Sequence, residues 1–311
     1  MTTRPALAAC ALLAAFQLPL PAQTVLDRSP LVSGGWVGLP GSLSVSTPFR
    51  FSKPERPDLD VFVVPSFQFA LGLPAWTLVG GQYAAQSQVV EGDAGEWEVF
   101  GRFKPLVQYR GAPFDLAVQA GYNGGAKSLD GEAVAARWLG PLRVMGAGRF
   151  FSDAFGSGES RGAVAGGAVF YPAPRTLAVA LAGDAGVLLD REEGEDVAWS
   201  VALQVGIPYT VNTVSLFATN TGSSTLQGVS RGMGRTQYGL ELTLPIPLGS
   251  FVGWYVPREV ATRSVHEPPG PPARLVSASI YRFAYVQDRI EIEAGTTVEW
   301  TNDDAMVHTV T

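Results

Sequence analysis

The sequence is poor in cysteine, histidine and charged residues. Its 311 residues include one cysteine and two histidines, and only 16% of them are charged. The single thiol, Cys10, excludes a disulfide, a zinc-thiolate centre or an iron-sulfur cluster built within this sequence. The formal net charge is -6 and there is no basic block, so the cationic surface that binds a nucleic-acid backbone is also missing. We therefore expect neither thiol catalysis nor a nucleic-acid partner.

The first 22 residues are typical of an export signal. A short cationic start ends at Arg4, an almost uncharged apolar stretch follows over 5–20, and small residues suited to cleavage lie at 21–23. Gln17 and Pro19 interrupt this stretch, which makes it too short for a membrane-spanning helix. We predict a signal peptide over 1–22, and hence export.

Beyond the signal there is no apolar run long enough for a membrane helix, but alternating segments recur between turn residues. The clearest covers 197–207, where a large apolar residue takes every second position. In 96–104 and 237–244, the charged residues fall on the face opposite the large apolar ones. A soluble β-sandwich shows the reverse contrast, so this pattern favours a membrane barrel with an apolar exterior.

These segments extend from about Leu31 to Val256 and have the length of tilted membrane strands. We predict an all-β fold: an antiparallel up-and-down outer-membrane β-barrel over 23–257, with about twelve strands. Tight connections at 111–113 and 140–141 contrast with long ones at 190–196 and 222–234, as in such barrels.

Two side-chain patterns refine this prediction. Aromatic residues near segment ends are expected to form girdles at the lipid headgroups; they are Trp36, Trp76, Trp97, Trp138, Phe150, Phe151, Tyr171, Trp199, Tyr209 and Trp254. Small residues on the predicted inner face indicate a narrow, filled interior; they are Ala117, Gly121, Ala147, Ala178, Ala180 and Ala182. The sequence therefore argues against a wide general porin.

Short motifs at 36–38, 72–74, 115–123 and 218–241 resemble a functionally uncharacterised family of bacterial outer-membrane barrels. The resemblance covers most of residues 30–256. It implies an outer-membrane location and lipid as the partner of the barrel, with no established substrate.

A proline-rich run at 267–272 identifies residues 258–273 as a linker, since such a run cannot pair in a sheet. Strand signals resume at 275–280, 290–292 and 298–300. This second unit comprises residues 274–311, which is too short for an independent core. We expect it to be the first part of a larger domain.

Residues 283–310 resemble the first half of a plastocyanin-like cupredoxin, through Phe283, the segment 290–304 and the segment 306–310. The resemblance implies a Greek-key β-sandwich and makes His308 the first ligand of a blue-copper site. The family's other ligands, a cysteine, a second histidine and usually a methionine, follow later in that family and are not in this sequence. One imidazole cannot form such a site, so we predict no type 1 copper from these residues alone.

Other candidate sites are weaker. The acidic loop residues Asp190, Glu192, Glu193, Glu195 and Asp196 could bind a hard cation such as calcium, although a solvated loop explains them equally well. His266 and Met306 could add ligands to copper, but a linker histidine and a packed methionine are the simpler interpretations.

The main functional prediction is a barrel in the outer membrane of a Gram-negative-type bacterium that anchors a cupredoxin-like domain. By resemblance, the intact protein binds copper and carries electrons or holds copper at the cell envelope, with a redox partner or copper donor and with the tail periplasmic or extracellular. It is not expected to be an enzyme. One alternative is a barrel for passive transport or surface structure with a vestigial tail. The second is a soluble periplasmic β-sandwich that binds a ligand.

Overall fold

The computed structural model describes residues 25–52, 63–85, 87, 89–90, 95–172, 178–207, 210, 212–248, 275–281, 284–285, 290–293 and 296–302. The chain divides into two compact units, one of Met1–Ile207 with Val211–Tyr255 and one of Pro208–Thr210 with Val256–Thr311. The predicted signal peptide, the linker at 258–273 and the residues His266, Met306 and His308 lie outside the described residues.

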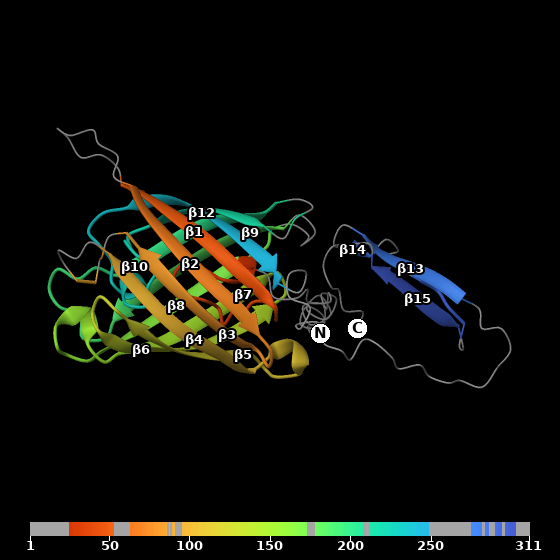
Figure 1. The fold of residues 1–311 in the computed structure, drawn as a ribbon, viewed down its shortest axis with the longest axis horizontal. Coiled ribbons are helices and arrows are strands. Elements are labelled where there is room, and N and C mark those ends of the chain that lie inside the picture. The colour runs from red at the N-terminus through yellow and green to blue at the C-terminus, as the bar shows by residue number, and fades with distance from the viewer. Residues whose placement is uncertain are drawn as a thin grey trace, which may run out of the picture. The chain divides into compact units, whose positions relative to one another are not determined.

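The first unit contains one closed sheet in which every strand is antiparallel to both of its neighbours (Figure 1). Its strands are β1 (Ser42–Ser52), β2 (Val63–Leu73), β3 (Thr77–Ala84), β4 (Glu96–Leu106), β5 (Asp115–Asn123), β6 (Ser128–Leu139), β7 (Leu142–Phe151), β8 (Arg161–Phe170), β9 (Val179–Leu188), β10 (Ala198–Gly206), β11 (Thr213–Thr219) and β12 (Gln237–Pro247). Sequential strands are neighbours, and β1 pairs with β12 to close the ring. The predicted up-and-down barrel of about twelve strands is confirmed, whereas the alternative of a two-sheet sandwich is wrong for this unit.

Alternation along each strand separates a polar interior from an apolar exterior. On β4, Glu96, Glu98 and Lys104 are buried inside the barrel, whereas Trp97 and Val99 between them are exposed. Other strands expose the same kind of residue, including Phe67, Phe69, Val118, Leu129, Phe150, Val164, Leu181, Val201, Leu216 and Tyr238. The inward orientation of charge predicted from the sequence is confirmed.

The first strand begins later than the sequence predicted. Residues 31–41 form no strand, and β1 starts at Ser42. Glycine explains the difference, because Gly34, Gly35, Gly38 and Gly41 all have positive φ, which a strand does not accommodate. Residues 25–41 instead enter the barrel.

Three aromatic residues predicted for the girdles lie elsewhere. Trp36, Phe151 and Tyr171 are buried in apolar clusters. Trp97 and Phe150 do face outward, as a girdle requires. Tyr209 and Trp254 lie outside the described residues. Aromatic residues near the strand ends therefore lie on both the inner and the outer face of the barrel. Near the end of a strand, alternation alone could not predict which of the two faces an aromatic residue occupies.

The two ends of the barrel have connections of different length. At the end where β1 begins, β2 and β3 are joined by 74–76, and β6 and β7 by only Gly140 and Pro141. At the opposite end the connections include 189–197 between β9 and β10 and 220–236 between β11 and β12. The tight and long connections predicted from the sequence thus fall on opposite ends of the barrel.

The second unit contains a three-stranded sheet. Its strands are β13 (Leu275–Tyr281), β14 (Ala284–Tyr285) and β15 (Thr297–Asn302), and β13 is central, parallel to β15 and antiparallel to β14. Within the described part of the tail there is one sheet, and the predicted cupredoxin sandwich is not shown. Among all described residues, no helix has the length and apolar character needed to cross a membrane.

Candidate functional site: a filled lumen

Residues 25–41, here called the plug, run through the interior of the barrel. Their polar contacts reach β2, β4, β6, β7, β9, β10 and β12, which lie all around the ring. Only a segment inside the barrel can touch so many of its walls. Most of these contacts use the main chain of the plug, because a stretch without strand partners must find acceptors and donors for its peptide groups elsewhere.

Three arginines of the wall donate hydrogen bonds to plug carbonyls. The pairs are Arg149 Nη2 to Leu31 O at 2.5 Å, Arg143 Nη2 to Gly34 O at 2.7 Å and Arg102 Nη1 to Trp36 O at 2.6 Å. All three guanidinium groups are buried. Hydrogen bonds from a charged donor in a water-poor site are the strong kind, so these three arginines hold the plug on one side.

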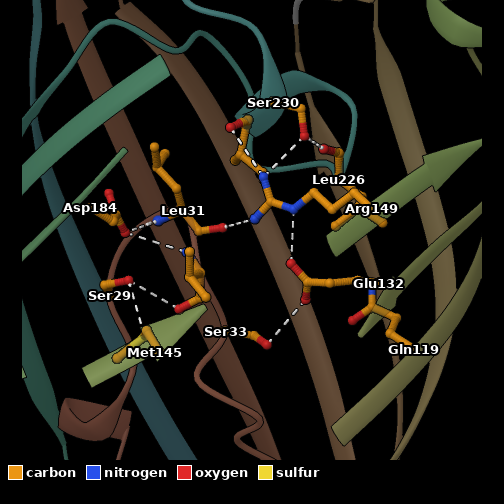
Figure 2. A network of polar contacts seen from close by, with 12 residues as sticks. Ser29, Leu31, Ser33, Gln119, Glu132, Met145, Arg149, Asp184, Leu226 and Ser230 are labelled. Carbon is orange, nitrogen blue, oxygen red and sulfur yellow. Dashed lines mark hydrogen bonds and ion pairs between the residues drawn. The ribbon is translucent and has the colours of Figure 1, made fainter. Parts of the chain in front are cut away.

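A second set of contacts holds the plug through carboxylates. Asp184 Oδ2 on β9 accepts hydrogen bonds from the main-chain N–H of Leu31 at 2.7 Å and of Val32 at 3.3 Å. Arg28 of the plug pairs with Glu241 on β12. Figure 2 shows Leu31 between Asp184 on one side and Arg149 on the other. Main-chain carbonyls of the plug thus accept hydrogen bonds from arginines of the wall, whereas main-chain N–H groups and Arg28 of the plug bind carboxylates of the wall.

Apolar packing completes the docking of the plug. The indole of Trp36 is 6% exposed and lies in a cluster with Val25 and Val37 of the plug and with Leu78 and Phe100 of the wall. A Trp or Phe side chain buried in this way contributes about 3–5 kcal/mol. The plug is therefore held by its side chains as well as by its peptide groups.

Residues 220–236, here called the inner loop, enter the barrel from the end with the long connections. The N–H of Leu226 donates to Glu98 at 2.7 Å, and the Gln227 amide donates to Asp130 at 3.0 Å. On the opposite side of the loop, Arg50 donates to Ser223 O at 3.1 Å. The inner loop is thus held by the same type of contact as the plug.

A small polar cavity remains between the plug and the inner loop. Its volume is about 80 Å³, and its lining includes Arg28, Gln68, Arg102, Gln119, Glu132 and Gln204. This space suits a few water molecules, whereas pockets for organic ligands run to about 300–1,000 Å³. The predicted narrow, filled interior is confirmed, but two chain segments fill it in addition to small side chains.

The wall also carries buried ion pairs. Asp115 accepts a hydrogen bond from Arg143 at 2.8 Å and lies 3.4 Å from Lys104 Nζ, so one carboxylate serves two cations. Glu132 pairs with Arg149 at 2.9 Å. A buried charge destabilises the fold unless it is paired, so Asp115 and Glu132 stabilise the barrel by pairing with these buried cations.

The predicted metal sites receive no support. Among the described residues, which include the acidic loop at 190–196, no group of three or more histidine, cysteine, aspartate or glutamate side chains is arranged to hold a metal ion. Glu195 instead forms a bidentate pair with Arg161. His308 lies outside the described residues, and copper binding there stays a prediction. The donors in this sequence do not fit a type 1 copper site, because Cys10 is the one thiol and it lies in the predicted signal peptide.

The Arg161–Glu195 pair gives a prediction for pH. Hydrogen bonds from Arg161 hold the pKa of Glu195 below its ordinary value, because they favour the ionised carboxylate. The stabilisation is then present above the ordinary carboxyl pKa and is lost as the pH falls through the lowered one. Glu192 N–H donates to the same carboxylate at 2.9 Å. We expect the hydrogen-exchange protection factor of the Glu192 amide to fall as the pH is lowered, and to become independent of pH in Glu195→Gln. A protection factor that depends on pH in the same way in Glu195→Gln as in the unmodified protein would contradict this assignment.

Comparison with solved structures shows similarity to an outer membrane channel, whereas the two sequence comparisons find no match. No protein-family model matches the chain, and no curated protein matches it. The crystal structure of an outer membrane channel from Pseudomonas putida F1 is similar with a TM-score of 0.44 and 11% sequence identity, over 68% of this chain and 98% of that chain. Neither the resemblance to a barrel family nor the resemblance to cupredoxins is supported by a family model.

Proposed function

We propose that this protein spans the outer membrane of a bacterium as a closed channel that conducts when the plug leaves the lumen. The exterior of the strands supports the membrane location, because large apolar side chains face outward while charged ones are buried inside. The closed ring also satisfies the main-chain hydrogen bonds of every strand without an open edge, which a lipid environment demands. Lipid is then the partner of the outer surface.

The lengths of the connections support one orientation of the barrel in this proposal. Bacterial outer-membrane barrels have short turns on the periplasmic side and long loops outside the cell. The end with Gly140 and Pro141 is then periplasmic, and the inner loop enters from outside.

The buried charges of the wall are the observation that carries the proposal of a channel. A barrel that served only as an anchor or as surface structure would be at least as stable with an apolar filling, since buried ion pairs often cost more than hydrophobic replacements. Here Arg102, Arg143 and Arg149 each donate one hydrogen bond to a carbonyl of a segment that is not part of the wall. Once the plug leaves, water can solvate these three guanidinium groups. A wall that carries charged side chains is therefore compatible with a water-filled pore.

A reversible crosslink tests this function. A Cβ built on Gly35 of the plug lies 3.0 Å from Ala117 Cβ on β5. Disulfides have Cβ–Cβ distances of about 3.5–4.5 Å, so cysteines at both positions have to move apart by about 0.5–0.8 Å to form one. We expect Gly35→Cys/Ala117→Cys to show no channel openings in a planar bilayer when oxidised. Reduction is expected to restore the openings of the unmodified protein.

Gly35→Cys alone is the matched control, since it carries the same change at positive φ but cannot crosslink to the wall. Oxidant should not silence this single variant. Openings that persist in the oxidised double variant, with the crosslink verified by mass, would overturn the proposal. A protein without any current in either redox state would favour the alternative of a surface or anchoring barrel.

A further inference from the structure

Leu31 of the plug connects an acidic and a basic group of the lumen through its own main chain. Its N–H lies 2.7 Å from Asp184 Oδ2, and its carbonyl oxygen lies 2.5 Å from Arg149 Nη2 (Figure 2). Asp184 is 8% exposed and Arg149 is 5% exposed, so both groups are buried. One amino-acid unit thus spans the distance between a carboxylate and a guanidinium.

Both charged groups are held in place by the wall and the inner loop. Arg149 also bonds to Glu132 at 2.9 Å and to the Ser230 hydroxyl at 3.0 Å, and Asp184 accepts a hydrogen bond from Ser200. None of these partners belongs to the plug. The two groups are therefore expected to keep their separation when Leu31 withdraws.

The side chain of Leu31 has its own apolar surroundings. It is 5% exposed and packs with Ala198 at the start of β10 and with Val229 of the inner loop. These neighbours also remain when the plug leaves. The site therefore has three parts: a carboxylate, a guanidinium and an aliphatic contact between them.

From this geometry we infer that the open lumen binds a free α-amino acid with an aliphatic side chain in the place that Leu31 occupies. The inference rests on the proposed function, because the site is vacated only when the plug leaves. A free amino acid has the same N–Cα–C–O skeleton as the residue it replaces. Its ammonium group then binds Asp184 and its carboxylate binds Arg149, with full charges in place of the peptide dipoles.

The test uses L-leucine and two analogues on the open channel. Trp36→Ala provides the open channel, because the indole docks the plug in an apolar cluster that shares no residue with the cluster around Leu31. We expect L-leucine to interrupt the ion current at a concentration at least tenfold lower than 4-methylpentanoate, which lacks the ammonium group. The same difference is expected for 3-methylbutylamine, which lacks the carboxylate.

A wall variant separates the two ends of the ligand. Asp184→Asn is expected to weaken the block by L-leucine about tenfold and to leave the block by 4-methylpentanoate unchanged. Asp190→Asn, the same change at an exposed position of the β9–β10 loop, is the control. If the Trp36→Ala protein carries no current, the proposed function fails. If it conducts but leucine and the analogues act alike, or if Asp184→Asn affects all three equally, this inference alone is overturned.

Discussion

Replacing Trp36 with alanine is expected to raise the ratio of open to closed channels roughly a hundredfold. The indole is buried between the plug and the wall, and removing such a side chain costs about 3–5 kcal/mol of docking free energy. Each 1.4 kcal/mol is about a tenfold change in an equilibrium constant, which gives two orders of magnitude or more. Single-channel recording in planar bilayers measures this ratio directly.

Trp97→Ala is the matched control for this result. Trp97 lies on β4 and faces outward, with 45% of its surface exposed, so its removal does not affect the plug. Both variants should keep the heat-modifiable gel mobility of a folded barrel, because neither change touches the strand pairing. A Trp36→Ala barrel that is folded and stays closed would show that the plug is a permanent part of the core.

The sequence predicted the wall of the barrel because one short-range rule determines it. Alternation of large apolar and polar residues assigns the two faces of β4, β10 and β12, and the charges of Glu96, Glu98, Arg102 and Lys104 follow from it. The same rule cannot identify residues that enter the lumen, because a segment inside a barrel is surrounded on every side and has no alternation. The strands predicted from alternation therefore begin at about Leu31, although the first strand of the barrel starts at Ser42.

Signals for the plug and the inner loop are nevertheless present in the composition. Two prolines and four glycines lie within 30–41, a density that a membrane strand of similar length does not tolerate. Over 220–236, serine, threonine, glycine and glutamine dominate with little charge, which suits a loop that is buried against polar groups. The pairing of Leu31 with both Asp184 and Arg149 could not be predicted, since it joins residues that are distant in the sequence.

Replacing Asp115 with alanine is expected to destabilise the barrel by about 3–5 kcal/mol. Its carboxylate balances Lys104 and Arg143, both of which are almost fully buried, so its loss leaves two cations unpaired. Urea titration followed by the gel mobility of the folded barrel measures the change. Adding Lys104→Met to the variant removes one of the unpaired charges and should recover part of the loss; no recovery would show that Asp115 acts through its hydrogen bond to Gln108 N–H instead.

Combining Asp115→Ala with Trp36→Ala links the stability of the barrel to the proposed opening. In the closed barrel Arg143 also donates to Gly34 O, so the plug keeps water from this cation. With the plug displaced, water reaches Lys104 and Arg143 and replaces the missing carboxylate. The two changes are therefore expected to cost roughly 1–3 kcal/mol less together than the sum of their separate effects, as measured in a double-mutant cycle. Strict additivity would mean that the plug does not leave when Trp36 is removed, and the channel proposal would then lose its physical basis.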